Sequence, residues 1–349
     1  MEEAIVMNRR HALIAYILVV CTLILGFISR AAETHSGSWT IMKSDEPGSV
    51  EFGLIEHHGT HNSNHQDTMA IQSFQGLDLS KPGRQDAKFA LVRDAGRFDC
   101  QGYLENGEGA GTFHFLADAN YAKQMQALGF GGIDDDKQEL MALLDVSLDF
   151  ARQIKAQNLS GMDTDKLIAF RIHGVTPQFI EGIRKSGVNT SDSDQLVAFR
   201  IHGVSPEFID ALHKAGHSVT DPEKLIAFRI HGVSPEMIQA LNAAGYKPSD
   251  DDLIAMRIHG ASPEWIAQLK NVGYSGMEID KLIAFRIHGV SPDFIEKIQK
   301  LGYQHPDPDQ LVAMRIHGVT PEYIAGLRSQ GMKDLSIDQL VSLRIHGVD

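Results

Sequence analysis

Four histidines lie close together in the segment EHHGTHNSNH, which covers residues 56–65. Neutral imidazoles are common ligands of zinc and copper, so this segment is a candidate metal site that could serve a metal-dependent enzyme. A solvated polar loop is the competing interpretation, because no HExxH helix frames the cluster and no nucleophile is paired with a base. We expect no catalytic residue and no cofactor. The candidate metal ligands are His57, His58, His61 and His65.

The motif Arg-Ile-His-Gly occurs seven times, and its arginines form a second candidate site. Successive arginines are 29 residues apart, with one interval of 28. A row of guanidinium groups could line a groove for an acidic ligand. Alternatively, it could form a structural ladder that ties each repeat to the next. The arginines are Arg171, Arg200, Arg229, Arg257, Arg286, Arg315 and Arg344.

The seven histidines of the motif favour packing and helix capping over metal binding. Stacked helices lie about 8–10 Å apart, whereas a zinc ion needs each ligand nitrogen within about 2.1 Å. Neighbouring repeats therefore cannot share one ion. A charged histidine is favourable at a helix C-terminus. Equivalent histidines could also act together as an acid sensor.

A period of this length is typical of a solenoid, and each unit reads as two short capped helices. In 205-SPEFIDALHKAG-216, Ser205 is the expected N-cap, proline follows at N1, and Gly216 ends the helix. The partner helix begins four residues before the repeated leucine. Seven residues occupy its cap position, with Glu278 the weakest: Asp163, Asp192, Asp221, Ser249, Glu278, Asp307 and Ser336.

The same pattern of N-cap residues and terminal glycines continues upstream as far as Asp118, in a region without the motif. In 147-SLDFARQIKAQN-158, Asn158 takes the position of the terminal glycine. The segment 136–145 matches a shortened first helix, and 118–129 matches a second helix. About sixteen helices are expected. Isolated helices this short are marginal in water, so they must be stabilised by stacking on their neighbours.

A helical wheel at about 100° per residue separates the arginine from the histidine. Arg200 and Ile201 fall within an apolar arc that also contains Leu196, whereas His202 falls on the opposite side. A charge on an apolar face needs a partner. The candidates are exposed carbonyls at helix ends and the acids at N2 of the second helices, which are Glu207, Glu236, Glu264, Asp293 and Glu322.

Residues 36–116 are expected to form a small antiparallel β domain. The segments 49–56, 88–95 and 111–116 are rich in β-prone residues, and Asn106-Gly107 is a favoured hairpin turn. Gly109 and Gly111 would permit a bulge or a longer loop. Cys100 is expected to be a packed thiol. The fold class is therefore α+β: this domain, then an α-solenoid of about eight two-helix repeats of about 29 residues over residues 118–349.

The N-terminus has the pattern of a secretory signal or a membrane anchor. Arg9 and Arg10 precede an unbroken apolar run at residues 12–28, with small residues after it. The run could be cleaved after Ala31 or could stay as an anchor. In either case residues 1–11 would be cytoplasmic and residues 30–349 would lie in the periplasm or outside the cell. Cys21 follows Val20, which does not fit a lipoprotein site.

Composition bounds the function further. The chain has 349 residues, of which 43% are hydrophobic, and a net charge of −13. This charge opposes nucleic acid as a partner, since phosphate binding needs a basic face. The sequence G-V-S/T-P-E between helices resembles helix-hairpin-helix modules that bind DNA phosphates. It has Ser205 where that family has its second glycine, and Glu207 where a lysine usually stands.

The repeats, together with the preceding GRFDCQGYLENGEGAGTFHF, are similar to repeat regions of bacterial envelope proteins, some attached to BlaR/MecR-type antirepressor metallopeptidases. The chain lacks the HExxH and the several membrane helices of those peptidases, so no peptidase residue carries over. The resemblance implies an extracytoplasmic sensing or interaction role. We expect a scaffold or sensor that binds a protein, peptide or envelope polymer. Its specificity should lie at exposed positions that vary between repeats, such as Asp210, Gln239, Gln268 and Glu296.

Overall fold

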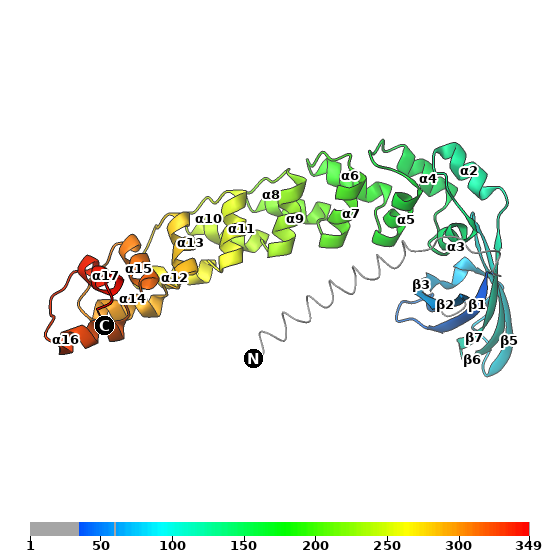
Figure 1. Ribbon diagram of the computed structural model, residues 1–349. Coiled ribbons are helices and arrows are strands. Elements are labelled where there is room, and N and C mark those ends of the chain that lie inside the picture. Colours follow the sequence, from blue (N-terminus) through cyan, green and yellow to red (C-terminus); the bar gives the residue numbers. More distant parts are fainter. Residues whose placement is uncertain (1–34, 59–60, 349) are drawn as a thin grey trace. The chain divides into compact units, whose positions relative to one another are not determined.

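The computed structural model describes residues 35–58 and 61–348, and it divides into two compact units (Figure 1). The first unit contains the described residues up to Gln124 together with Ile133–Ser147. The second contains Met125–Gly132 and the chain from Leu148 onward. None of the helices in the described residues is long and apolar enough to cross a membrane. The expected signal or anchor at residues 12–28 lies outside the described residues.

The first unit is built on a seven-stranded antiparallel sheet with the order β3-β2-β1-β7-β6-β5-β4. The expected antiparallel β domain is therefore confirmed. A short 3₁₀ turn, η1 at Ile71–Ser73, precedes the fourth strand. The strands are β1 at Ser36–Lys43, β2 at Ser49–His58, β3 at His61–Ala70, β4 at Phe74–Gln75, β5 at Arg84–Arg93, β6 at Gly96–Glu105 and β7 at Glu108–Ala117.

The hairpin between β6 and β7 turns at Asn106-Gly107, as predicted. Both residues have positive φ, at 55° and 89°, which a two-residue turn of this type requires. Gly109 and Gly111, however, form neither a bulge nor a loop, because they lie in the regular register of β7. A Cβ on Gly111 would lie 2.7 Å from Nε1 of Trp39. The glycine therefore makes room for the buried Trp39 ring.

The sheet curls around one aromatic core (Figure 1). Phe52 on β2 and Phe74 on β4 lie near opposite ends of the strand order, yet their ring centroids are 5.0 Å apart. Phe89 contacts both rings, and it also packs edge-on against Trp39 with centroids 4.9 Å apart. Edge-to-face aromatic pairs stabilise beyond the area that they bury. This cluster therefore fixes the curvature of the sheet.

Helix α3 (Asp135–Leu143) belongs to the same unit as the sheet. Its Gln138 side chain donates to the carbonyl oxygens of Ala95 and Asp118, at 2.7 Å each. The buried Glu139 pairs with His35. These contacts satisfy buried polar groups of α3 within the sheet unit. The segment 136–145 has the sequence pattern of a first helix, but its helix packs within the sheet unit.

Sixteen α-helices follow in tandem in the described residues, which confirms the expected helical repeat architecture. Helix α2 spans Tyr121–Leu128. The first helices of the motif repeats are α5 at Thr164–His173, α7 at Ser193–His202, α9 at Pro222–His231, α11 at Asp250–His259, α13 at Ile279–His288, α15 at Pro308–Ile316 and α17 at Ile337–Ile345. The second helices are α4 at Leu148–Lys155, α6 at Pro177–Lys185, α8 at Pro206–Lys214, α10 at Pro235–Ala243, α12 at Pro263–Asn271, α14 at Pro292–Lys300 and α16 at Pro321–Ser329.

The helix boundaries follow the capping rules closely. All seven expected residues are the N-caps of the first helices, and Glu278 alone makes no side-chain cap bond. Ser205 accepts a hydrogen bond from the Phe208 amide at the start of α8. Asn158 has a φ of 52°, in the left-handed region, as its glycine-like position predicts. Capping thus sets the length of the short helices.

The stack is held together by like helices of successive repeats, first on first and second on second. The buried faces supply leucine, phenylalanine, isoleucine and methionine, for example Leu196 and Phe199 of α7 and Ile209 and Leu212 of α8. These helices bury little within one unit, so the neighbouring repeat completes each core, which is the logic of a solenoid.

The second helices are also linked by a polar ladder that the sequence analysis missed. A side chain in the last turn of each linked helix donates to a carbonyl oxygen at the end of the preceding second helix, 27 residues earlier. Such bonds satisfy carbonyls that helix ends leave open. They run from Arg184 to Gln157, from Asn242 to Ala215 and from Gln299 to Val272, at 2.9 Å each, and from Arg328 to Leu301 at 2.6 Å.

Candidate binding surface

The Arg-Ile-His-Gly motif lies at the C-terminal end of each first helix. The glycine that follows each motif histidine has a φ between 69° and 75°, in the left-handed region. Glycine adopts this conformation without strain, so each first helix ends within one residue of the same motif position. The arginine, isoleucine and histidine therefore recur at equivalent positions along the solenoid.

The arginine side chain of one repeat binds the backbone of the repeat before it. In α7, Nε of Arg200 donates to the carbonyl oxygen of His173 at 3.0 Å. The same bond recurs four times, at 3.1 to 3.4 Å. Carbonyl bonding at helix ends, one of the two partner sets considered from the sequence, is thus what the geometry shows. The further pairs are Arg229 with His202, Arg257 with His231, Arg286 with His259, and Arg315 with His288.

The guanidinium group also covers an aromatic ring of the preceding second helix. The ring belongs to the residue 21 positions before the arginine, and the guanidinium carbon lies 4.7 to 5.1 Å from its centroid. Contacts at this distance are attractive cation–π interactions. Arg257 is the exception, because Met237 occupies the ring position. The pairs are Arg171 with Phe150, Arg200 with Phe179, Arg229 with Phe208, Arg286 with Trp265, Arg315 with Phe294, and Arg344 with Tyr323.

The acids at N2 of the second helices do not form ion pairs with these arginines, contrary to one expectation. The Ser205 side chain and the helix backbone bind the Glu207 carboxylate, and these bonds lower the pKa of Glu207. Bonds to the helix backbone and to the N-cap hydroxyl likewise lower the pKa values of Glu236, Glu264 and Glu322. The charges of Arg200 and Arg257 add a smaller lowering of the pKa at Glu207 and Glu264. A carboxylate at a helix N-terminus satisfies amides that lack an internal partner. These acids therefore act as caps of their own helices.

Five exposed arginines keep terminal N–H donors that have no acceptor in the described residues. Each is exposed, and each uses only Nε in the bonds described above. Within the described part of the chain, they make no other hydrogen bond or close ion pair. A guanidinium carries five N–H donors. Terminal N–H groups thus remain available on Arg200, Arg229, Arg257, Arg286 and Arg315.

The isoleucine of the motif is exposed in every repeat, which the helical wheel did not predict. Its exposed fraction runs from 47% in Ile172 to 57% in Ile345. The side chain four residues earlier, such as Val197 or Ile226, is half-buried on the same helix face. The isoleucines form an exposed apolar row: Ile172, Ile201, Ile230, Ile258, Ile287, Ile316 and Ile345.

The motif histidines form a further row beside the isoleucines. His202 and its equivalents in the later repeats are exposed, whereas His173 in the first repeat is half-buried. Burial lowers the pKa of His173, because a low-dielectric environment disfavours the charged imidazolium. In the residues that the structure describes, no three potential ligands come together as a metal site.

The four histidines of the segment 56–65 lie in two paired strands, β2 and β3, whereas one interpretation of the sequence was a solvated polar loop. His58 on β2 is opposite His61 on β3, and His65 is opposite Leu54. The side chains of His57, His58 and His61 lie outside the described residues. Metal binding by this segment stays a prediction, which metal analysis of the purified protein would test.

Cys100 and His217 are two further side chains with groups that could do chemistry. Cys100 is a buried free thiol, as expected, and burial followed by the charge of Asp99 raises its pKa to about 12. Such a thiol is packed and unreactive. His217, which stands where other repeats have an apolar residue, bonds through Nε2 to Asp250 of the next repeat at 2.6 Å.

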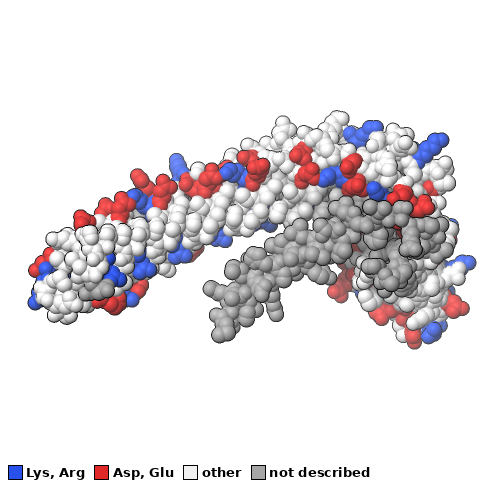
Figure 2. Space-filling model, in the orientation of Figure 1, with Lys and Arg blue, Asp and Glu red and all other residues white. Residues whose placement is uncertain are grey.

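The long edges of the solenoid differ in charge. Asp and Glu side chains gather along one edge in Figure 2, and Lys and Arg appear along the other. Three acids at the starts of first helices form ion pairs with lysines of the preceding repeat. These pairs are Lys166–Asp194, Lys224–Asp251 and Lys281–Asp309.

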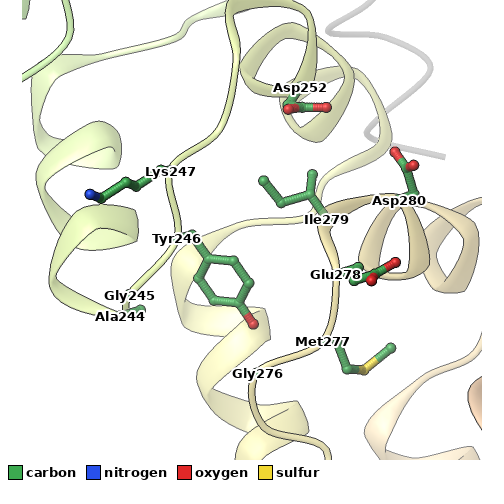
Figure 3. Close-up of a pocket in the computed structure, with 10 residues that line it drawn as sticks. All are labelled: Ala244, Gly245, Tyr246, Lys247, Asp252, Gly276, Met277, Glu278, Ile279 and Asp280. Atoms are coloured by element: carbon green, nitrogen blue, oxygen red, sulfur yellow. The ribbon is translucent and has the colours of Figure 1, made fainter.

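A shallow hollow of about 480 Å³ is lined by residues of two neighbouring repeats (Figure 3). The Tyr246 hydroxyl points toward the Met277–Glu278 segment in Figure 3, and Asp252 and Asp280 lie at the rim. Burial raises the pKa of Tyr246. None of the ten lining residues is a serine, threonine, cysteine or histidine, so the hollow brings together no activated nucleophile of those types.

Comparison with known proteins leaves the surface to be interpreted on its own geometry. No protein-family model matches the chain, and no curated protein matches it significantly.

Proposed function

We propose that this protein is an extracytoplasmic binding protein, a scaffold or sensor of the bacterial cell envelope. The repeats present a surface to a protein, peptide or envelope polymer. Residues 12–28 direct the chain to the membrane as a signal or anchor, with residues 30–349 beyond the cytoplasm. The resemblance of the repeats to envelope proteins supports this location.

One observation carries the proposal: every motif repeat exposes the same isoleucine, and in five of the seven repeats the neighbouring arginine is exposed too. A stack needs the arginines, the capping glycines and the buried leucines. Stacking does not require an aliphatic side chain that is about half exposed to water in all seven motif repeats. Contiguous exposed apolar surface with polar neighbours is typical of an interaction site.

A photo-crosslinking scan in the producing cells tests the proposal. A photoreactive amino acid would replace one exposed residue at a time in the full-length protein. Sites on the isoleucine row, such as Ile201 and Ile287, are compared with sites on the second helices, such as Gln239 and Glu296. Lys88 on the sheet is the control. Specific adducts at solenoid positions support the proposal. Adducts only at Lys88, or at no position, would contradict it.

A further inference from the structure

We infer that the motif face of the solenoid binds an extended acidic segment of a protein that carries apolar side chains between its acids. This inference rests on the proposed binding function and names its surface and its ligand. The surface, which we term the Arg–Ile face, consists of the five exposed arginines from Arg200 to Arg315 and the seven exposed isoleucines.

The arginines are held in place for a ligand before it arrives. Nε of Arg286 is bonded to the His259 carbonyl at 3.1 Å, and its guanidinium lies over the Trp265 ring. Two constraints on one side chain leave it little rotational freedom to lose on binding. The remaining N–H groups can form the paired bonds that a planar guanidinium makes with a carboxylate. The ligand should therefore carry acidic groups.

The isoleucines argue for a peptide ligand over a purely ionic polymer. Each motif places an exposed isoleucine directly after its arginine. A polyanion without apolar groups would leave this row in water, whereas a peptide can cover it with its own aliphatic side chains. The protein's net charge of −13 repels every anionic ligand at long range, an acidic peptide included. Apolar contact must therefore contribute to binding.

The repeat spacing suggests the form of the peptide. Stacked helices lie about 8–10 Å apart. In the polyproline II conformation three residues make one turn of about 9.3 Å, so every third side chain points the same way. An acid at every third position could therefore meet one arginine in each successive repeat. The acids at N2, such as Glu207, bond to their own helix ends, and Arg200 contributes only a smaller, through-space effect on the pKa of Glu207.

Fluorescence anisotropy with a synthetic probe tests the inference. The probe is a fluorescein-labelled peptide with six Glu-Leu-Pro units, titrated with the full-length protein. Peptides with Gln in place of Glu, or with Ser in place of Leu, are the matched controls. We expect saturable binding of the probe and at least tenfold weaker binding of both controls. Failure of the probe to bind, or equal binding of either control, would overturn the inference.

Variants of the protein locate the binding and separate it from folding. The double variant Ile230→Ser, Ile287→Ser changes exposed side chains and should keep the wild-type circular dichroism melt while binding the probe at least tenfold more weakly. Lys88→Ala, at an exposed position on the sheet, should bind like wild type. The double variant Arg229→Gln, Arg286→Gln should also lose binding, but the arginines have structural contacts, so the isoleucine pair is decisive. If the isoleucine double variant binds the probe as tightly as wild type, the probe binds elsewhere on the protein and the inference is overturned.

Heparin, a sulfated polymer, tests whether the surface binds an anionic polymer in place of an acidic peptide. It should bind weakly and without dependence on Ile230 and Ile287. Tight heparin binding that the isoleucine variant leaves unchanged would replace the peptide with an anionic polymer and overturn the inference. Crosslinks at Gln239 or Glu296 without probe binding would leave the proposed function standing and remove only the Arg–Ile face. The absence of crosslinks anywhere on the solenoid would remove both.

Discussion

The guanidinium carbon of Arg286 lies 5.1 Å from the centroid of the Trp265 ring, which belongs to the preceding repeat. The same side chain donates from Nε to the His259 carbonyl of that repeat. One residue therefore contacts both helices of its neighbour. This geometry explains how an exposed arginine can contribute to the stability of the stack while its outer donors stay free.

We expect Arg286→Met to lower the free energy of unfolding by about 1–2 kcal/mol, because it removes a charged hydrogen bond and a cation–π contact. Arg257→Met should cost less, by about 0.5–1 kcal/mol, because Met237 lies where other repeats have a ring. Urea unfolding of both variants makes the comparison. Equal losses would show that the ring contributes nothing.

The same logic predicts a gain at Met237. Met237→Phe would place a ring under Arg257, as Phe208 lies under Arg229. A double-mutant cycle with Arg257→Met separates ring stacking from core packing. We expect a favourable coupling energy of about 0.5–1 kcal/mol between residues 237 and 257. A coupling energy near zero would contradict the assigned role of the stack.

Two equivalent glycines of second helices should respond differently to alanine. Gly326 in α16 has open space around it, so Gly326→Ala should stabilise the protein by about 0.5–1 kcal/mol through helix propensity. In α6, a Cβ on Gly182 would lie 2.6 Å from Cγ of Pro206 in the next repeat. Gly182→Ala should therefore lose that gain or destabilise. Thermal melts of the two variants decide the matter.

We expect the capping glutamates to contribute stability that is lost at acidic pH. The folded pKa values of Glu207, Glu236, Glu264 and Glu322 lie below the usual 4.5. The native state therefore binds fewer protons than the unfolded chain in this range. Their stabilisation is present in full above about pH 4.5 and disappears as the pH falls through the lower folded values. A fourfold Glu→Gln variant should show a smaller drop in melting temperature between pH 5.5 and pH 3.5 than wild type. An identical drop in both proteins would refute this assignment.

We expect Tyr274→Phe to lower the free energy of unfolding by removing a hydrogen bond between adjacent repeats. The Tyr274 hydroxyl donates to the carbonyl oxygen of the buried Pro306 at 2.6 Å, and burial raises its pKa to about 12. Tyr274→Phe leaves that carbonyl without its donor and should cost about 1–3 kcal/mol. Tyr103→Phe, at an exposed ring on the sheet, should change stability by less than about 0.5 kcal/mol. Urea midpoints measure both.

The local structure of the repeats could be predicted because it depends on neighbouring residues. Asp163, Ser205 and Asn158 act at helix ends as their types require, since capping bonds reach only two or three residues along the chain. Asn106-Gly107 likewise sets its own turn. The wheel failed for Ile201 because the arc that the stack buries is centred between Leu196 and Phe199. Ile201 points about 170° away from that centre at 100° per residue.

The sequence by itself determined the repeat length, the helix boundaries and the antiparallel sheet, because caps, turns and apolar periodicity act over short distances. The tertiary structure decided which side chains meet across repeats. Only stacking brings Arg286 over Trp265, places Gln299 against the Val272 carbonyl, and leaves the seven isoleucines uncovered. Such relations depend on how one unit sits on the next, and the residues that face each other lie 20 or more positions apart in the chain.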